Sequence, residues 1–452
     1  MKLFAHQETT AAFYVKTPRA FNTSSPGTGK TISSIEGFKR SRKPGDKLLV
    51  LAPLSILQPS WGKDIEKFCP TWGYGIAHGT PAKRAKIIRG NYDVVVTNHD
   101  AVNWIAKDLS AIEGFTHIVI DEFTAFKNRT TGRSKALKKI TDIIPSVWML
   151  SGTPNSNSNL DLWFPSLLLD KGERLGKRFF EFRSAVCLPQ QVGPDPQHVQ
   201  WLDKPGAEFD IADRLKDITI RFQAEDCIDL PEHRVQDVLI DMPKWLNTQY
   251  RDLLRHDVLE TASGDITSFH AGARVRKLLQ LLSGAVYDGE GGILKIHVER
   301  YNLVMDLIEA RDQVVVAFNY KHERDQLIAC AKARKISYGV IDGDANIHQR
   351  NRAVEDFQHG AIKVIFAHPQ SAGHGLTLTN GVATIWCSPT YNAEHYQQFN
   401  CRIYRAGQTK KTETIRIAYN DSKEIEVYNK LDGKVTRMDD LLELFQQFTE
   451  VA

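Results

Sequence analysis

Short apolar runs alternate with helix-like patterns in two parts of the chain, before residue 170 and after residue 298. Such alternation is typical of a parallel sheet whose strands are joined by crossover helices. In the first part, the runs that predict strands are 20–23, 47–52, 93–97, 117–121 and 146–150. In the last part, they are 313–318, 338–341, 362–367, 383–387 and 413–417. We therefore predict an α/β chain with two parallel-sheet lobes.

Between these parts the strand pattern stops and helical spacing takes over. Helices are predicted near 161–169, 245–259 and 275–282, with a loop over 189–205, which is rich in Gln, Pro, Gly and Asp, and a turn or hairpin at 288–292. This predicts three regions: a first lobe over 1–170, a helical and loop insertion with the inter-lobe region over 171–297, and a second lobe over 298–452. The second lobe would end in helices at 424–431 and 441–448.

Composition narrows the class of protein without deciding it. A chain of 452 residues with 42% hydrophobic and 25% charged residues is long enough for two or three globular domains. Its net charge of +4 permits a nucleic-acid partner but does not require one. No apolar run reaches the ~20 residues of a membrane span, and the N-terminus lacks a secretory signal. The six cysteines form no Cys-x-x-Cys pair, so we predict neither zinc nor disulfides, and a cytoplasmic location.

The segment 24–31, Ser-Ser-Pro-Gly-Thr-Gly-Lys-Thr, follows the first predicted strand and opens a helical pattern. A phosphate-binding loop needs this context. Its backbone would bind ATP through Pro26, Gly27, Thr28 and Gly29. Lys30 would reach the β- and γ-phosphates, and Thr31 would bind Mg²⁺. The usual first residue is Gly and here it is Ser24; the alternative is a chance Gly-Lys-Thr in a surface turn.

Polar residues follow two later strands, at the sheet edge where open α/β sheets bind ligands. Asp121 and Glu122 end the strand 117–121: Asp121 would hold the Mg²⁺ shell, and Glu122 would orient or deprotonate the attacking water. Ser151 and Thr153 follow the next strand and could sense the γ-phosphate. Taken alone, either motif could be a solvated turn.

The second lobe has no phosphate loop, so it must contribute to the first lobe's nucleotide in trans. The candidates are Arg402 and Arg405, which are three residues apart and so would share one face of a helix. Guanidinium groups donate two parallel hydrogen bonds, which suits the charge on a transferring phosphoryl group.

The stretch 171–183 interleaves basic and aromatic residues. Two interpretations remain open: a surface that grips a nucleic-acid strand, or a helix with core aromatics and a solvated basic face. The residues are Lys171, Arg174, Lys177, Arg178, Phe179, Phe180, Phe182 and Arg183.

Together the ordered motifs resemble the Swi/Snf-type, chromatin-remodeller-like ATPases of helicase superfamily two. The segments that carry the resemblance are 3–7, 27–31, 52–57 with Trp61, 121–128, 151–154, 341–357, 371–378 and 398–408. The family usually has His where this chain has Thr124. The resemblance covers nearly the whole chain and implies two RecA-like lobes with an ATP site in the cleft between them.

The resemblance also implies further site residues. Gln7 would read the adenine edge, and Gly375 and Gln398 would lie at the nucleotide. The implied nucleic-acid contacts are Ser55, Thr97, Asn98, Lys127, Asn128 and Ser371.

The implied activity is a DNA-stimulated ATPase that translocates on duplex DNA and uses ATP and Mg²⁺. Duplex DNA is the favoured partner and single-stranded DNA the second. The chain resembles a minimal, standalone motor of bacterial or phage type. One alternative is a strand-separating DNA or RNA helicase of the same superfamily. The other is a non-catalytic scaffold, which is disfavoured because Lys30, Asp121, Glu122, Arg402 and Arg405 are all present.

Overall fold

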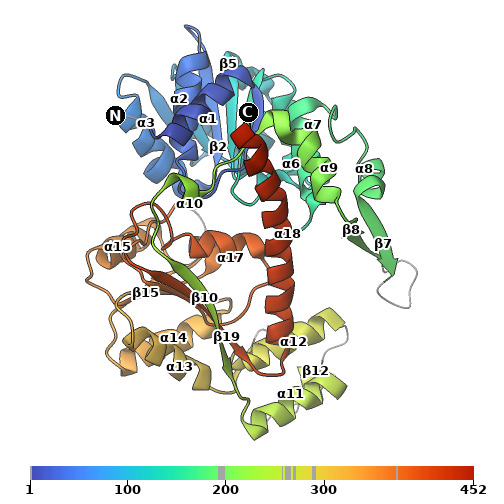
Figure 1. Cartoon of the computed structure of the whole chain (residues 1–452). Helices are drawn as coiled ribbons and strands as arrows, with labels where there is room; N and C mark the ends of the chain where they lie inside the picture. The colour runs from blue at the N-terminus through green and yellow to red at the C-terminus, as the bar shows by residue number, and fades with distance from the viewer. Residues whose placement is uncertain are drawn as a thin grey trace. The chain divides into compact units, whose positions relative to one another are not determined.

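The computed structural model describes residues 3–191, 199–256, 258–259, 266–267, 271–287, 292–372 and 375–451. The chain forms two compact units (Figure 1). Unit 1 comprises Met1–Asp229 and Lys434–Ala452, and unit 2 comprises Leu230–Gly433. These boundaries differ from the predicted ones at 170 and 297, because the middle region is divided between the units instead of forming a region of its own.

Unit 1 contains a seven-stranded sheet in the order β3-β4-β2-β5-β6-β1-β9. All its neighbouring strands run parallel. The strands are β1 (Arg19–Asn22), β2 (Lys47–Ala52), β3 (Tyr74–Ala77), β4 (Val94–Asn98), β5 (Phe115–Asp121), β6 (Ser146–Leu150) and β9 (Thr219–Ile220). The strands predicted in this part of the chain are confirmed to within two residues.

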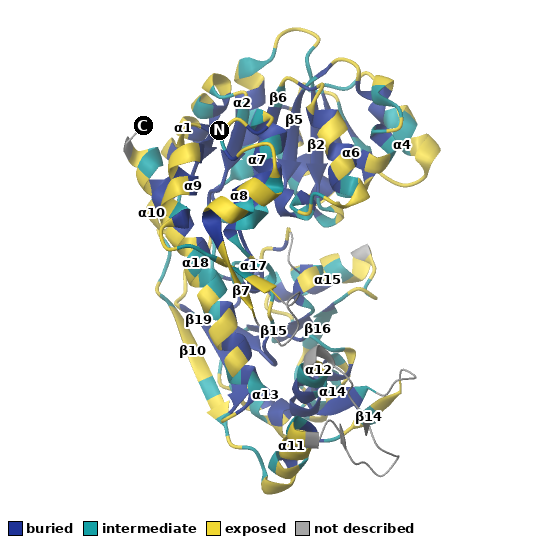
Figure 2. Ribbon diagram, turned by 90° about the vertical axis from the view of Figure 1, so that its right-hand side faces the viewer, coloured by how far each residue is buried: buried dark blue, intermediate teal, exposed yellow. Residues whose placement is uncertain are grey.

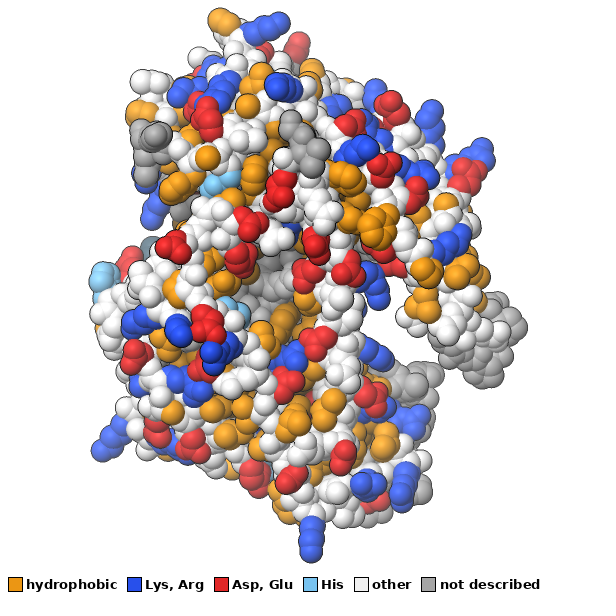
Figure 3. All heavy atoms as spheres, viewed as in Figure 1, with side chains coloured by type: hydrophobic (Ala, Val, Ile, Leu, Met, Phe, Trp, Pro, Cys, Tyr) orange, Lys and Arg blue, Asp and Glu red, His pale blue; other side chains and the backbone are white. Residues whose placement is uncertain are grey.

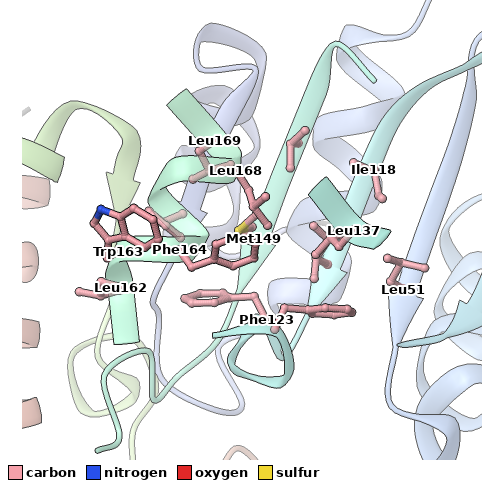
Figure 4. Close-up of a cluster of buried hydrophobic side chains, with 14 of the residues drawn as sticks. Leu51, Ile118, Phe123, Leu137, Met149, Leu162, Trp163, Phe164, Leu168 and Leu169 are labelled. Carbon is pink, nitrogen blue, oxygen red and sulfur yellow. The ribbon is translucent and has the colours of Figure 1, made fainter. Parts of the chain in front are cut away.

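Helices cover both faces of this sheet and create two cores. In β2, Leu49 and Leu51 face one core while Leu48 and Val50 face the other, and all four are fully buried. Figure 4 shows part of the first core, where Leu51 and Met149 lie among side chains from α6 and α7. The helices are α1 (Ala5–Lys16), α2 (Lys30–Ser41), α3 (Lys63–Phe68), α4 (Pro81–Ile88), α5 (Val102–Ile105), α6 (Gly132–Thr141), α7 (Trp163–Asp170), α8 (Phe179–Val186), α9 (Ala207–Leu215) and α10 (Ala224–Cys227).

Unit 2 contains a six-stranded parallel sheet in the order β10-β19-β18-β15-β17-β16. Its strands are β10 (His233–Ile240), β15 (Val314–Ala317), β16 (Tyr338–Ile341), β17 (Val364–Ala367), β18 (Ala383–Trp386) and β19 (Thr412–Tyr419). Its helices are α11 (Lys244–His256), α12 (Ala271–Leu282), α13 (Glu299–Glu309), α14 (Lys321–Ala333), α15 (Ile347–Gln358), α16 (Pro369–Ala372) and α17 (Ala393–Asn400). The predicted α/β fold with two parallel-sheet lobes is confirmed.

Three features differ from the prediction. The loop predicted over 189–205 contains an antiparallel hairpin, β7 (Cys187–Gln191) with β8 (Val199–Asp203). The edge strand β10 was expected to be part of a helical region; it is exposed along most of its length, so it lacks a buried apolar pattern (Figure 2). The two predicted C-terminal helices are one helix, α18 (Lys423–Val451), which begins in unit 2 and ends in unit 1.

Two smaller points complete the comparison. Of the turn predicted at 288–292, residues 288–291 lie outside the described residues, and Gly292 precedes the short strand β14 (Ile293–Lys295), which pairs with β13 (Ala285–Tyr287). Across the described residues, no helix is long and apolar enough to cross a membrane.

Candidate nucleotide site

The predicted phosphate loop joins β1 to α2, at the carboxyl edge of the unit 1 sheet. Gly27 and Gly29 have φ values of 90° and 83°, a left-handed conformation that favours glycine. The Lys30 ammonium donates hydrogen bonds to the carbonyl oxygens of Ser24 (2.7 Å) and Ser25 (3.2 Å). The lysine is therefore folded back over its own loop.

Ser24, the departure from the usual glycine, has a defined structural role. Its side chain is buried, and its Oγ accepts a hydrogen bond from the backbone N–H of Phe222 (3.1 Å). The next N–H, that of Ser25, donates to the Phe222 carbonyl (2.9 Å). The loop is thus fastened to the segment that follows β9.

That segment is itself held by a buried arginine. Arg221 donates to the carbonyl oxygen of Thr23, and its backbone N–H donates to Oγ1 of Thr449 in α18 (3.0 Å). Burial lowers the pKa of Arg221 to about 10, which still leaves it charged at neutral pH. The end of α18 therefore supports the segment on which the phosphate loop rests.

Helix α1 packs on the other side of the loop. Gln7 donates from Nε2 to the Thr28 carbonyl oxygen (3.2 Å), and its Oε1 accepts from the N–H of Phe4 (3.1 Å). His6 donates from Nε2 to the same Thr28 oxygen (2.8 Å). A Cβ at Gly29 would lie only 2.3 Å from the Gln7 amide nitrogen, so the contact itself requires glycine. Gln7 thus lies at the phosphate loop, and adenine recognition by it stays a prediction.

The two carboxylates end β5, and the strand between them and the phosphate loop is β6. The Ser151 hydroxyl, at the end of β6, donates to Oε2 of Glu122 (3.1 Å) and accepts from the N–H of Thr153 (3.1 Å). A Cβ at Gly152 would lie 2.8 Å from Cδ of Pro26. The structure thus brings Glu122, the 151–153 turn and the phosphate loop together at one sheet edge.

Asp121 is held by two residues that the sequence did not single out for this purpose. Its Oδ2 accepts a hydrogen bond from the Trp61 indole (2.9 Å), and its backbone carbonyl accepts one from His99 Nε2 (2.7 Å). Burial lowers the pKa of His99 to about 4, so this ring stays neutral. Burial also raises the pKa of the Asp121 carboxyl. Both partners act from the ends of other segments, so no local spacing indicates them.

The predicted nucleic-acid contacts in unit 1 are not equally available. Thr97 is fully buried and its hydroxyl donates to the Ala77 carbonyl (2.7 Å), so the prediction that it contacts nucleic acid is wrong for its side chain. Lys127 donates to Asp161 and to Ser156, both at 3.0 Å. Three others reach the surface wholly or in part: Ser55, Asn98 and Asn128.

In unit 2, the arginine pair lies beyond its helix. Helix α17 ends at Asn400, so Arg402 and Arg405 are in the following turns and the predicted shared helix face is wrong. Their guanidinium groups nevertheless converge, since both donate to the Leu376 carbonyl oxygen, at 3.3 Å and 3.0 Å. Burial lowers the pKa of Arg405.

The other predicted residues of unit 2 precede this pair in the chain. Gln398 is buried, and its carbonyl oxygen accepts from Arg402 Nε (2.8 Å). Gly375 is exposed with a φ of 71°, and it precedes Leu376, whose carbonyl oxygen accepts from both arginines. Ser371 is half-buried in α16. The part of this motif at 373–374 lies outside the described residues.

Two family models match the chain. The SNF2-related domain matches residues 23–284, and the helicase conserved C-terminal domain matches residues 299–407. The first match alone covers more than half of the chain. The chain belongs to the SNF2-related family. The predicted family is confirmed, and with it the predicted class of enzyme, a helicase-like ATP hydrolase.

Several proteins resemble this SNF2-related chain along most of its length. Protein p41 of Acyrthosiphon pisum secondary endosymbiont phage 1 is 28% identical over 402 residues, which cover 85% of this chain and 84% of that protein. Chromodomain-helicase-DNA-binding protein 1-like of Danio rerio is 22% identical, covering 92% of this chain and 41% of that protein. Human DNA annealing helicase and endonuclease ZRANB3 is 26% identical, covering 84% and 35%.

The SNF2-related chain therefore spans less than half of the two animal relatives. Among solved structures, the Sulfolobus solfataricus SWI2/SNF2 ATPase core in complex with dsDNA aligns with a TM-score of 0.45 and 21% identity, over 100% of this chain and 95% of that one.

Proposed function

We propose that this protein is a DNA-stimulated ATPase that couples ATP hydrolysis to translocation on duplex DNA. The observation that carries the proposal is the hydrogen bond from Ser151 to Glu122, within a sheet edge that also holds the phosphate loop. A carboxylate at the end of one strand is tied to a hydroxyl at the end of the next, beside the loop that would hold the phosphates. Phosphoryl transfer depends on such positioning more than on covalent chemistry.

Each side chain at this edge has a definable part in hydrolysis. Lys30 exchanges its bonds to the Ser24 and Ser25 carbonyls for the β- and γ-phosphate oxygens. Glu122 orients or deprotonates the attacking water. Ser151, which bonds Glu122 and the Thr153 N–H together, transmits a change at the γ-phosphate to the turn after β6.

The residues present suit Mg²⁺ as the metal. Thr31, at the start of α2, and Asp121, at the end of β5, offer a hydroxyl and a carboxylate oxygen, the hard ligands that Mg²⁺ prefers. No group of three His, Cys, Asp or Glu residues in the described part of the chain could hold a metal by itself. That fits an ion bound by one or two protein oxygens and the substrate phosphates. The ion would neutralise phosphate charge.

We propose that Arg402 and Arg405 supply positive charge to the transferring phosphoryl group. Both are held on one acceptor, the Leu376 carbonyl, which fixes their direction without neutralising them. Arg405→Ala is expected to lower kcat by about 10²- to 10³-fold with duplex DNA saturating, because a preorganised transition-state contact is lost. ATP affinity, measured with a fluorescent nucleotide, should change much less. A fall in affinity as large as the fall in kcat would contradict this role.

DNA is the substrate class that the relatives support, since the names of two of them refer to DNA, and the duplex form is part of the proposal. A motor that grips phosphates should bind with little sequence preference and a steep dependence on salt. The test is the ATPase rate of the full chain across duplex, single-stranded and forked DNA and RNA, with Glu122→Gln as the inactive control.

Stimulation by duplex DNA, abolished in Glu122→Gln, would support the proposal. Stimulation by RNA with strand separation would instead favour a helicase. An ATPase rate that no nucleic acid changes would exclude a DNA motor.

A further inference from the structure

A cluster of arginine and aromatic side chains lies in unit 1, outside the nucleotide site. Arg129 follows the 121–128 motif, Phe179, Phe180 and Arg183 belong to α8, and Trp201 belongs to β8. We call these five residues the arginine–aromatic cluster. They lie where α8 meets the β7–β8 hairpin, which projects from the rest of unit 1 (Figure 1).

Both guanidinium groups stack on the aromatic rings. Arg129 Cζ lies 4.8 Å and 5.2 Å from the ring centroids of Phe179 and Phe180. Arg183 Cζ lies 5.0 Å from Phe180 and 3.8 Å from Trp201. Two cations therefore lie near the Phe180 ring, and the residue is still 60% exposed.

The protein core does not account for this exposed ring. Phe182 and Val186, four residues apart on α8, are the buried residues of that helix and join the large core of unit 1. Phe180 lies on the opposite face. The ring contacts Phe179, Arg129 and Arg183 but keeps an exposed apolar surface.

The charges of the cluster are not neutralised by nearby carboxylates. Within the described part of the chain, neither Arg129 nor Arg183 forms an ion pair, whereas their neighbour Arg178 pairs with Glu181 (2.9 Å). Arg183 Nε is buried without a hydrogen-bond acceptor among the described residues. Figure 3 shows basic and apolar side chains side by side around the base of the hairpin. The cluster therefore combines positive charge, spare donors and an aromatic face.

We propose that the arginine–aromatic cluster binds an unpaired nucleotide of a DNA strand. The base stacks on Phe180, and Arg129 and Arg183 neutralise the adjoining phosphates. This deepens the proposed function, on which it rests, by adding a site for single-stranded DNA to a motor on duplex DNA. An acidic peptide would use the arginines but would leave the Phe180 ring without a planar partner, so the exposed aromatic favours a nucleotide.

The cluster also lies close in sequence to the catalytic carboxylates. The segment between Glu122 and Arg129 begins with the short helix Phe123–Phe126, whose two phenylalanines are buried. Arg133 and Ser134 bind the carbonyls of Ala125 (2.7 Å) and Phe126 (2.8 Å). A DNA strand bound at Arg129 would thus contact the segment that directly follows Glu122 in the chain.

The test measures binding of the full chain, without ATP, to fluorescein-labelled oligo-dT and to a labelled duplex by anisotropy. Phe180→Leu keeps an apolar side chain but removes the aromatic face. The matched control is Phe209→Leu. Phe209, on α9 of unit 1, is also 60% exposed, but among the described residues no arginine stacks on its ring. Thermal melting of both variants establishes that they fold.

Phe180→Leu is expected to weaken oligo-dT binding by roughly fivefold or more, while Phe209→Leu leaves it unchanged. Binding to duplex, whose bases are already stacked, should change less than twofold. Phe180→Trp, which keeps an aromatic face, should bind oligo-dT as tightly as the wild type does. An abasic oligonucleotide should bind wild-type protein as weakly as oligo-dT binds Phe180→Leu, and the variant should not distinguish the two ligands.

Equal oligo-dT affinity in Phe180→Leu and wild type would overturn the proposal. Displacement of oligo-dT by poly-glutamate at equal charge concentration would also overturn it and assign the surface to an acidic peptide. If duplex DNA stimulates ATP hydrolysis but oligo-dT does not bind, this proposal fails and the proposed function stands. If no nucleic acid binds or stimulates, both fail.

Discussion

The two units differ in what lies at the start of the helix that follows an interior strand of the sheet. In unit 1, β1 leads through the phosphate loop into α2, which begins at Lys30. In unit 2, β15 leads through a short turn into α14, which begins at Lys321. In unit 2, Glu323 accepts hydrogen bonds at one oxygen from the N–H groups of Asn319 (2.6 Å) and Tyr320 (3.1 Å). Helix α2 has no acidic residue in its first turn and no side-chain cap.

The first turn of a helix exposes N–H groups and favours a negative charge or an acceptor. Unit 2 supplies that acceptor from its own chain, in a fully buried position. Unit 1 has no such acceptor at the start of α2, and we propose that a phosphate of ATP binds there. On this proposal, the same local topology serves ligand binding in unit 1 and stability in unit 2.

The largest expected effect comes from comparing the first lysine of α2, Lys30, with the first lysine of α14, Lys321. Lys30→Ala should lower kcat for ATP by about 10²- to 10³-fold, because the cation that we propose to contact the phosphates is removed. Lys321→Ala is the matched control: this lysine is exposed and lies 3.6 Å from Asp344. Its ATPase rate should stay within about twofold of wild type. Equal losses in the two variants would erase the distinction between the units.

The next effect concerns the acceptor within unit 2. Burial raises the pKa of Glu323 to about 7, above its ordinary value of 4.5, although the Asn319 N–H opposes this. The folded state therefore binds the proton more tightly than the unfolded state. The contribution to stability is complete below pH 4.5 and is lost as the pH rises through about 7.

Glu323→Gln keeps an acceptor for the two N–H groups and removes this titration. Relative to wild type, the variant should gain on the order of 2 kcal/mol of unfolding free energy between pH 5 and pH 8. Denaturant unfolding at both pH values measures the change. Parallel pH profiles for the two proteins would show that Glu323 is not the titrating group.

The smallest expected effect tests how the phosphate loop is fastened. Ser24→Ala removes the acceptor of the part-buried Phe222 N–H and should cost about 1 kcal/mol of stability, with a few-fold rise in KM for ATP. Ser25→Ala is the control, since Ser25 contacts Phe222 through its backbone N–H. Ser24→Gly, which restores the common residue, should behave like Ser24→Ala. A Ser24→Gly variant as stable as wild type would show that the hydroxyl contributes nothing.

Most strands could be predicted because parallel strands that are buried on both faces are continuous apolar runs, as in Leu48–Leu51. β10 was not predicted because it is an edge strand whose apolar residues Val235 and Leu239 are exposed, so it forms no continuous apolar run. The C-terminal helix was read as two because Gly433 and its polar neighbours interrupt the apolar pattern, although the helix continues through them.

The candidate site divides in the same way. The phosphate loop and the Asp121–Glu122 pair are local motifs whose spacing carries their chemistry. The bonds that hold them are not local: Trp61 reaches Asp121 across 60 residues, and Phe222 reaches Ser24 across 198. Arg402 and Arg405 converge on a carbonyl 26 and 29 residues away instead of along a helix face. No short pattern encodes such contacts.

The passage of α18 between the units has a consequence for synthesis of the protein. Its residues Met438, Leu441 and Phe445 belong to the same core as Ile211 and Leu215 of α9. The ribosome makes α9 first and then all of residues 230–433 before it reaches them, which takes on the order of 10 to 40 seconds at typical elongation rates. During that time the nascent first unit presents an unfinished apolar surface, and its nucleotide loop lacks the support of Thr449. The unit that begins the chain is thus the last to be completed.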